Sequence, residues 1–390
     1  MFFILTDNLG VNRFKRATYF VALIFLFTGS IFSKEPLLKA LWVVRDDMIS
    51  KDLIDKFISY SVENGYKNVF VQVRGRGDAY YSSKLVPKSH LLSDNNFDPL
   101  AYVISKTKDL DLRIHAWLNV YYLWSSPNKP KQKDHLLLTK PEWIDTYTPD
   151  QILVDETLEK MKDNRKIIGE GFYLAPTHPE VEIHLQNVIT ELLQNYQLDG
   201  IHFDYIRFHD ANSGMNPIGL KVFLNHSNSL PGLPSLELKK TPSFAEFKRY
   251  SITNFIRKAS YRIKAYQPNC VISAAVKPQL EEAKNNFYQE WDEWLIGGYI
   301  DWAVPMNYTS NSDIFEKNIR IIKDVLPKKY LKKIMMGIGI YNQNYKSSIK
   351  KIEITKNYDL LGYSVFSYTS LKNNKSYSEK FNKLIIKNRY

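Results

Sequence analysis

The feature that best predicts the fold of this 390-residue chain is the run Asp199-Gly200-Ile201-His202-Phe203-Asp204-Tyr205-Ile206-Arg207. Successive side chains of a strand point to opposite faces, so Ile201 and Phe203 share one face, and His202 and Asp204 share the other. Burying an unpaired carboxylate is costly. Asp204, near the end of an apolar strand, therefore needs a partner or a chemical task, and Arg207 is the nearest candidate partner.

Seven further apolar segments surround this run, alternating with stretches that have helical spacing. The eight strand candidates are residues 40–44, 69–73, 114–118, 200–206, 271–276, 301–305, 334–340 and 362–367. Alternating strands and helices indicate a parallel sheet, and eight is the strand number of the TIM barrel. We therefore expect an α/β protein with a single (β/α)₈ barrel over residues 37–390. Long connections at 121–171 and 208–244 follow the third and fourth strands, where we expect them to wall a cleft.

The N-terminal 33 residues have the pattern of an export signal. Arg13, Lys15 and Arg16 precede a short apolar stretch at 17–28, and small residues follow at 29–33. This order is typical of a signal peptide, and the apolar stretch is short for a membrane span. We expect an exported protein, periplasmic or extracellular, that is membrane-anchored if the segment is not cleaved and otherwise not inserted in a membrane.

Charge and cysteine content narrow the function classes. The net charge is +12, but the lysines are scattered, which favours solvated surfaces over a nucleic-acid-binding band. The single cysteine, Cys270, excludes a disulfide within the chain and a cysteine-based zinc site. His115 and His202 lie on neighbouring predicted strands, where a buried hydrogen-bonded pair is favoured over a metal site. No metal or cofactor is predicted.

Several ordered motifs lie along the chain: the segment 69–82 with Arg74 and Asp78, the segments 97–102 and 115–121, the run 199–207, and the later blocks 291–294 and 305–308 with Asp301. Together they resemble a known family, the glycosyl-hydrolase-like family 10 of bacterial proteins. The resemblance extends over about residues 41–368. It implies a (β/α)₈ barrel acting on a carbohydrate, with bacterial cell-wall glycan strands as the expected substrate class.

The predicted site combines this resemblance with the expected strand ends. Asp204 is the predicted essential carboxylate. The residues predicted to bind sugar are polar or aromatic groups near strand ends: Arg74, Asn119, Tyr121, Trp124, His202, Arg207, Lys277, Asn307, Tyr308 and Tyr341. Trp42 and Trp117 are expected to pack in the core.

The second carboxylate that glycosidases normally use is less evident. The run 199–207 also resembles the chitinase-type Asp-Gly-x-Asp-x-Asp-x-Glu signature, but His202 and Ile206 replace two of its acids, which argues against a substrate-assisted mechanism. Asp78 ranks first as the partner, because Arg74 and Arg76 would hold it ionised. The other candidates are Asp46, Asp47, Glu281, Glu282, Asp292 and Glu293, whereas Asp301 opens a strand and is expected to be structural.

The sequence therefore favours a metal-independent glycosidase that acts on a bacterial envelope polysaccharide, with Asp204 and Asp78 as catalytic acids. Two alternatives stay open. One is a glycan-binding barrel without activity, and the other is a polysaccharide lyase with His202 as its base.

Overall fold

The structure is a computed structural model that describes residues 36–94, 96–148, 158, 170–226 and 242–387. Residues 37–390 group into one compact unit. None of the described helices has the length and apolar character needed to cross a bilayer. The predicted export signal, residues 1–33, lies outside the described residues.

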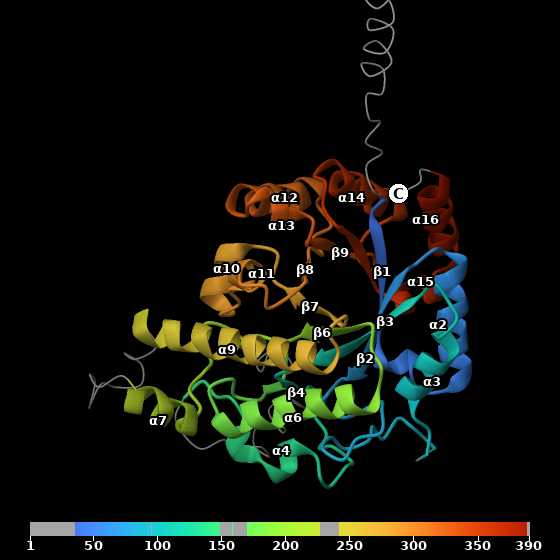
Figure 1. The fold of residues 1–390 in the computed structure, drawn as a ribbon. Coiled ribbons are helices and arrows are strands. Elements are labelled where there is room, and N and C mark those ends of the chain that lie inside the picture. Colours follow the sequence, from blue (N-terminus) through green and yellow to red (C-terminus); the bar gives the residue numbers. More distant parts are fainter. Residues whose placement is uncertain (1–35, 95, 149–157, 159–169, 227–241, 388–390) are drawn as a thin grey trace, which may run out of the picture. The chain divides into compact units, whose positions relative to one another are not determined.

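Eight parallel strands form the barrel in the order β8-β7-β6-β3-β2-β1-β10-β9 (Figure 1). The parallel bridges Ala303 to Ile334 and Met306 to Gly337 join β8 to β9 and close the ring. The predicted (β/α)₈ barrel is thus confirmed, with strands at each expected segment: β1 (Leu38–Val43), β2 (Asn68–Arg74), β3 (Arg113–Asn119), β6 (Gly200–Asp204), β7 (Val271–Val276), β8 (Trp302–Pro305), β9 (Met335–Gly339) and β10 (Gly362–Phe366).

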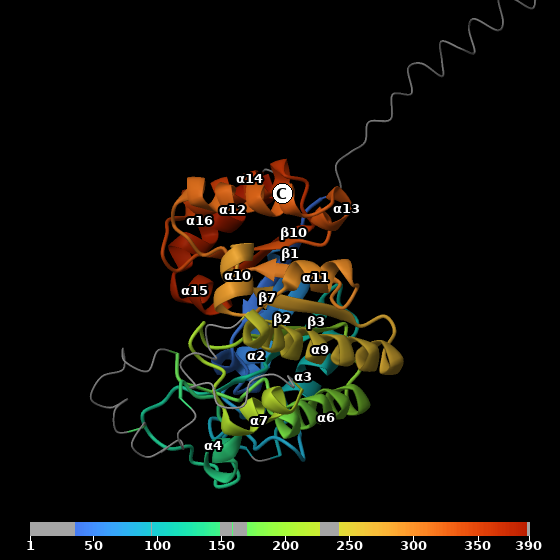
Figure 2. The same cartoon turned by 90° about the vertical axis from the view of Figure 1, so that its left-hand side faces the viewer.

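Helices surround the strands in both views (Figures 1 and 2). Two of them begin at residues whose side chains cap the helix, since Ser50 Oγ accepts from the Leu53 amide at 3.3 Å and Asp98 Oδ1 from the Ala101 amide at 2.9 Å. The helices are α2 (Lys51–Glu63), α3 (Pro99–Thr107), α4 (Leu136–Thr139), α6 (Pro179–Asn195), α7 (Pro217–His226), α9 (Pro242–Tyr266), α10 (Leu280–Asn286), α11 (Trp291–Ile296), α12 (Ser312–Val325), α13 (Lys328–Leu331), α14 (Tyr345–Asn357), α15 (Tyr368–Asn373) and α16 (Lys375–Lys387).

The two long connections carry structure of their own. The first contains α4 and a small antiparallel pair, β4 (Tyr122–Trp124) with β5 (Phe172–Tyr173), and the second contains α7. Two residues of the first connection, Tyr122 and Glu170, line a pocket at the carboxyl ends of the strands, which agrees with the expected place of this connection as a wall.

Asp199 and Gly200 both have a structural role at the start of β6. Asp199 Oδ2 accepts from the Ile114 amide at 2.8 Å, which fixes β6 against β3. A side chain at position 200 would place its Cβ 2.0 Å from His115 Nδ1, so only glycine fits beside that ring. Asp301 has the same task at β8, where it accepts from the Ile272 amide and Lys264 Nζ, both at 2.9 Å. Asp301 is thus structural.

The barrel interior is aromatic as well as apolar. His202 stacks on Phe70 with 4.1 Å between ring centroids and is hydrogen-bonded to Trp42 Nε1 at 3.1 Å and Ser273 Oγ at 2.9 Å. His115 is instead bonded to Asn68 at 3.0 Å, so the expected pairing of the two histidines was wrong. Cys270 is buried and unpaired in the described chain.

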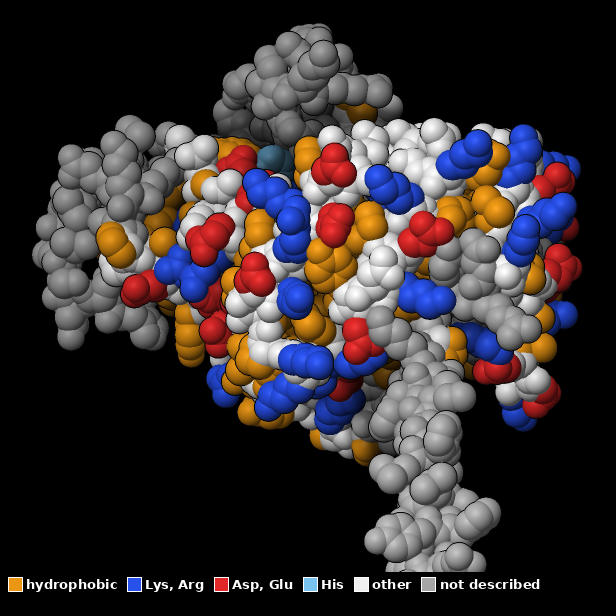
Figure 3. All heavy atoms as spheres, turned by 90° about the horizontal axis from the view of Figure 1, so that it is seen from above, with side chains coloured by type: hydrophobic (Ala, Val, Ile, Leu, Met, Phe, Trp, Pro, Cys, Tyr) orange, Lys and Arg blue, Asp and Glu red, His pale blue; other side chains and the backbone are white. Residues whose placement is uncertain are grey.

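The positive charge is dispersed on the face that carries α12 and α14. Lys and Arg side chains alternate there with Asp, Glu and apolar groups, and the described residues of this face form no continuous basic band (Figure 3). This distribution agrees with lysines that serve as solvated surface groups.

Candidate active site

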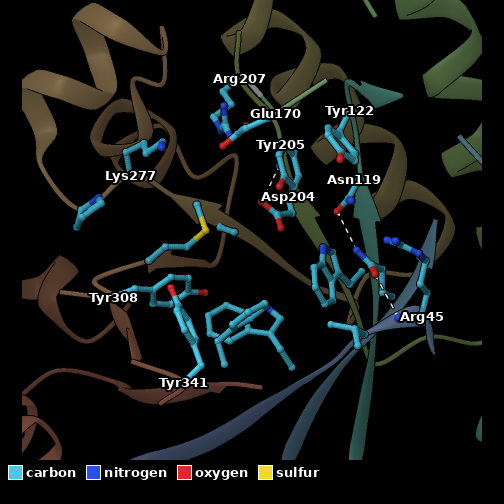
Figure 4. A pocket seen from close by; sticks show the side chains of 18 of the residues that line it. Arg45, Asn119, Tyr122, Glu170, Asp204, Tyr205, Arg207, Lys277, Tyr308 and Tyr341 are labelled. Atoms are coloured by element: carbon cyan, nitrogen blue, oxygen red, sulfur yellow. Dashed lines mark hydrogen bonds and ion pairs between the residues drawn. The ribbon is translucent and has the colours of Figure 1, made fainter. Parts of the chain in front are cut away.

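A pocket of about 640 Å³ opens at the carboxyl ends of the barrel strands, the face on which TIM barrels build active sites (Figure 4). Its wall mixes carboxylates, cations, amides and aromatic rings, the combination that binds sugars through hydroxyl hydrogen bonds and stacking. The lining residues are Trp42, Val44, Arg45, Asp46, Gln72, Trp117, Asn119, Tyr122, Glu170, Asp204, Tyr205, Arg207, Ala275, Lys277, Pro278, Glu282, Met306, Tyr308, Tyr341 and Phe366.

Asp204 is the last residue of β6 and lines this pocket with only 7% of its surface exposed. Its Oδ1 accepts from the Tyr205 amide at 2.7 Å. Burial raises the pKa of Asp204 to about 6, although the Tyr205 amide and Arg207 oppose this rise, and the charge of Glu170 adds to it. A carboxyl group with this pKa can hold a proton in weakly acidic solution and donate it.

The backbone turns sharply after Asp204. Tyr205 has a φ of 49°, in the left-handed region that is uncommon for a residue with a side chain. This conformation ends β6 two residues earlier than the sequence predicts. It also stacks Tyr205 on Tyr122, with centroids 4.5 Å apart, and leaves the Arg207 guanidinium 4.8 Å from the Tyr205 ring centroid.

A second carboxylate, Glu170, stands beside Arg207 at the same side of the pocket (Figure 4). Glu170 Oε2 accepts from Arg207 Nη2 at 2.7 Å and from the Tyr173 hydroxyl. Burial by itself would raise the pKa of Glu170, but Arg207 and Tyr173 outweigh it and lower the pKa below its ordinary value. Glu170 is therefore held as an anion while Asp204 is pushed toward its neutral form.

Sequence reasoning missed Glu170, because it precedes the two-residue strand β5 inside a long connection. No motif or periodicity distinguishes it from other acids there. A weak signal existed nonetheless. Arg207 needs an acid partner, and long connections at the carboxyl face of a barrel are where such a partner arises.

Aromatic rings form the opposite wall. Tyr308 stacks on Phe366, with ring centroids 5.4 Å apart, and Tyr341 is 58% exposed at the pocket rim. Trp42 and Trp117, expected to belong to the core, are buried but also line the pocket. Lys277 lines the pocket as well, and burial lowers its pKa.

Half of the predicted site residues meet in this pocket. Asn119 lines it while its amide is fixed by a bond from Gln72 Nε2 at 3.3 Å and one to the Gly75 carbonyl at 2.9 Å. The predicted residues that line it are Asn119, Asp204, Arg207, Lys277, Tyr308 and Tyr341.

The structure places Asp78 and Arg74 elsewhere. Neither lines the pocket, because the register of β2 against β3 shifts between Gln72 and Arg74. A shift of one position turns a side chain to the other face of the sheet. Arg74 is therefore buried against the carbonyls of Asn119 and Val120, and Asp78 Oδ1 accepts from the Arg76 amide at 2.8 Å. Asp78 does not face Asp204 across this pocket.

Four other predicted sugar contacts are also internal. Tyr121 packs on Phe255, and Trp124 Nε1 donates to the Asn128 carbonyl at 2.8 Å. Asn307 is buried and tied to the Phe315 carbonyl at 3.0 Å, and His202 is fully buried below the pocket residues Trp42 and Trp117. Tyr121, Trp124 and Asn307 follow the ends of β3 and β8 in the sequence, and His202 lies within β6, but all four side chains turn into the core.

Among the other carboxylates considered as partners, Asp46 and Glu282 line the pocket. Asp47 is buried and bonded to Thr369 Oγ1 at 2.5 Å and to Lys372, so it is structural. Glu281, Asp292 and Glu293 lie on α10 and α11, outside the lining. Within the described ranges, no group of three or more His, Cys, Asp and Glu side chains could hold a metal ion.

An eight-stranded parallel barrel whose carboxyl face holds a pocket lined by carboxylates, among them Asp204 and Glu170, and by a wall of aromatic rings defines a protein of the glycoside-hydrolase-like class. The chain belongs to the glycosyl hydrolase-like 10 family, whose model matches residues 38–358.

Two relatives support this membership. The chain is 23% identical over 279 residues to "Glycosyl hydrolase DigH" of Escherichia coli, covering 66% of this chain and 57% of the relative. It is 22% identical over 271 residues to "Glycosyl hydrolase YngK" of Bacillus subtilis, covering 63% and 46%. The chain thus spans about half the length of the curated relatives it matches.

Solved structures share the fold at low sequence identity. The glycoside hydrolase domain of PgaB (BpsB) from Bordetella bronchiseptica has a TM-score of 0.62 and 14% identity, covering 88% of this chain and 98% of that one. The catalytic domain of β-amylase from Paenibacillus polymyxa has a TM-score of 0.58 and 10% identity, covering 90% and 98%.

Proposed function

We propose that this protein is a glycosidase in which Asp204 is the general acid and Glu170 is the base or nucleophile. The observation that carries the proposal is the opposed ionisation of two carboxyl groups in one pocket. The pKa of Asp204 is raised to about 6 by burial, and the pKa of Glu170 is lowered by Arg207 and Tyr173. Two carboxyl groups whose surroundings drive their pKa values apart are the arrangement of acid-base glycoside cleavage.

The other residues of the pocket have supporting tasks in this proposal. Tyr308 and Tyr341 offer faces and edges for the apolar side of a sugar ring, and Asn119 and Lys277 offer polar groups for its hydroxyl or acetamido substituents. Arg207 keeps Glu170 ionised and in place. The side chain of Glu170 lines the pocket and is 45% exposed, so a water molecule or an anomeric carbon can approach its carboxylate.

The proposed substrate is a bacterial envelope polysaccharide, with peptidoglycan glycan strands first. The family membership and two relatives named glycosyl hydrolases support a glycan, and the predicted export of the chain supports an envelope location. Fractionation of cells that produce the full chain tests the location, and recovery in the cytoplasm would contradict it.

A direct assay decides between hydrolysis and simple binding. Wild type, Asp204→Asn and Glu170→Gln are incubated with peptide-free peptidoglycan glycan strands and with a polymer of β-linked N-acetylglucosamine, and new reducing ends are counted by mass spectrometry. We expect release by the wild type and a loss of several orders of magnitude in both variants. Asp78→Asn, an acid outside the pocket, is the matched control and should retain turnover.

A non-catalytic glycan-binding barrel is the competing function. This function predicts that the wild type and Asp204→Asn co-sediment with the polymers equally well. Neither protein should then release new reducing ends. Glu170 weakens this alternative, because the apparent lack of a second acid was its main support. A lyase that uses His202 as its base is not supported, since His202 is fully buried and does not line the pocket.

A further inference from the structure

A hydrogen-bonded group lies behind Glu170 and outside the pocket lining. His209 Nε2 lies 3.1 Å from the Glu170 amide nitrogen, which donates to it. His209 Nδ1 lies 3.0 Å from Asp210 Oδ2 and 2.5 Å from the Tyr147 hydroxyl, which is itself 3.0 Å from Asp210 Oδ2. The four residues come from two connections that are distant in the chain.

These contacts determine where the imidazole carries its proton. The Glu170 amide can only donate, so Nε2 must be the unprotonated nitrogen that accepts. Nδ1 then carries the hydrogen and donates to Asp210 Oδ2 and the Tyr147 oxygen, while the Tyr147 hydroxyl donates to Asp210. Each of these polar atoms has a hydrogen-bond partner in this single arrangement.

We propose that His209, oriented by Asp210 and Tyr147, is a positioning residue that holds Glu170 at the active site. The inference rests on the proposed function, since it concerns the carboxylate assigned there as base or nucleophile. Glu170 is fixed at two points, its carboxylate by Arg207 at 2.7 Å and its backbone by His209 at 3.1 Å. Arg207 and His209 belong to the same segment that follows Asp204.

The hydrogen bond from the Glu170 backbone to His209 matters because the side chain of Glu170 is 45% exposed and has little packing to hold it. Two hydrogen bonds to one carboxylate oxygen allow the rest of the residue to pivot about that oxygen. The bond from the backbone to His209 removes this freedom. A loss of about 1 Å in alignment can reduce a chemical step by on the order of 100-fold.

The test compares His209→Phe with His209→Gln. Phenylalanine keeps a ring against Tyr173 but offers no acceptor, whereas the glutamine amide oxygen can accept near the Nε2 position and does not titrate. On peptide-free peptidoglycan glycan strands, we expect kcat to fall on the order of 100-fold in His209→Phe with KM little changed, and to stay within about tenfold of wild type in His209→Gln. His90→Phe, at an exposed histidine, is the control.

Full activity in His209→Phe, or a loss of the same size in His209→Gln, would overturn the proposal.

Two measurements that need no activity keep this proposal separate from the proposed function. Nitrogen NMR of the wild type should show Nε2 of His209 unprotonated and Nδ1 protonated, and hydrogen exchange of the Glu170 amide should be faster in His209→Phe than in wild type or His209→Gln. The opposite tautomer, or equal exchange in all three proteins, contradicts the positioning role even if hydrolysis is found. If these measurements succeed and no glycan is cleaved, the positioning stands and the glycosidase assignment fails.

Discussion

Replacing Asp204 with asparagine should make the folded protein more stable at pH 8. Burial raises the pKa of Asp204 from 3.8 to about 6. The folded state therefore binds this proton more tightly than the unfolded state. Below about pH 3.8 the carboxyl is neutral in both states and carries no electrostatic cost. As the pH rises through about 6 the folded protein must hold a buried anion, and its stability falls.

The size of the effect follows from the two pKa values. A difference of one pH unit corresponds to about 1.4 kcal/mol, so the shift from 3.8 to about 6 corresponds to about 3 kcal/mol at pH 8. Asparagine is neutral at all pH values and keeps an oxygen for the Tyr205 amide, which donates to Asp204 Oδ1 at 2.7 Å. We expect an increase in the free energy of unfolding that approaches about 3 kcal/mol at pH 8 and falls well below about 1 kcal/mol near pH 4.

Urea unfolding of wild type and Asp204→Asn at the two pH values measures this difference. Asp210→Asn is a control with the opposite sign, because hydrogen bonds from His209, the Asn212 amide and Tyr147 outweigh burial and lower the pKa of Asp210 to about 2. That variant should lose stability at pH 8. If Asp204→Asn were no more stable than wild type at pH 8, Asp204 would be a structural partner of Arg207 and not a destabilised functional acid.

Three further outcomes follow from the site. The pH profile of kcat/KM should be bell-shaped. It should fall on the alkaline side near pH 6, where Asp204 loses its proton, and on the acid side below the ordinary pKa of a glutamate, where Glu170 gains one. Activity that rises steadily above pH 7 would exclude Asp204 as the acid. Arg207→Met should raise the pKa of Glu170 and move the acid side of that profile to higher pH, whereas an unmoved profile would show that the ion pair does not control Glu170. Asp47→Ala should lower the free energy of unfolding by about 1–3 kcal/mol, because it removes the buried carboxylate that accepts hydrogen bonds from Thr369 and from the partly exposed Lys372, while kcat of the folded protein stays unchanged. Calorimetry and the glycan assay check both parts.

The sequence by itself determined the barrel and one of the two proposed catalytic acids, Asp204. Eight apolar segments alternate with helical stretches, and strands that are buried on both faces must be apolar, so local composition is enough to locate them. Asp204 stands out for the same reason, since an acid at the end of such a strand is conspicuous. The resemblance of the ordered motifs to the family added the expectation of a carbohydrate.

The sequence failed where the direction of a side chain depends on the register between strands. Arg74 and Asp78 follow β2, but the register shift between Gln72 and Arg74 sends Gln72 into the pocket and Arg74 behind it. Strand alternation cannot reveal such a shift, because the shift arises from the pairing of β2 with β3. The predictions for Tyr121 and Asn307 failed for a similar reason, because a position near a strand end in the sequence does not determine the direction of the side chain.

The tertiary structure alone decided the identity of the second acid. Glu170 lies 34 positions before Asp204 in the chain, and only the folding of the connection between β3 and β6 brings it to Arg207. The ionisation of both acids is also a property of the fold, because burial raises one pKa and a neighbouring guanidinium lowers the other. A short run of residues can thus indicate one functional acid, Asp204. The pairing of Asp204 with a second acid depends on distances and desolvation that exist only once the barrel has closed.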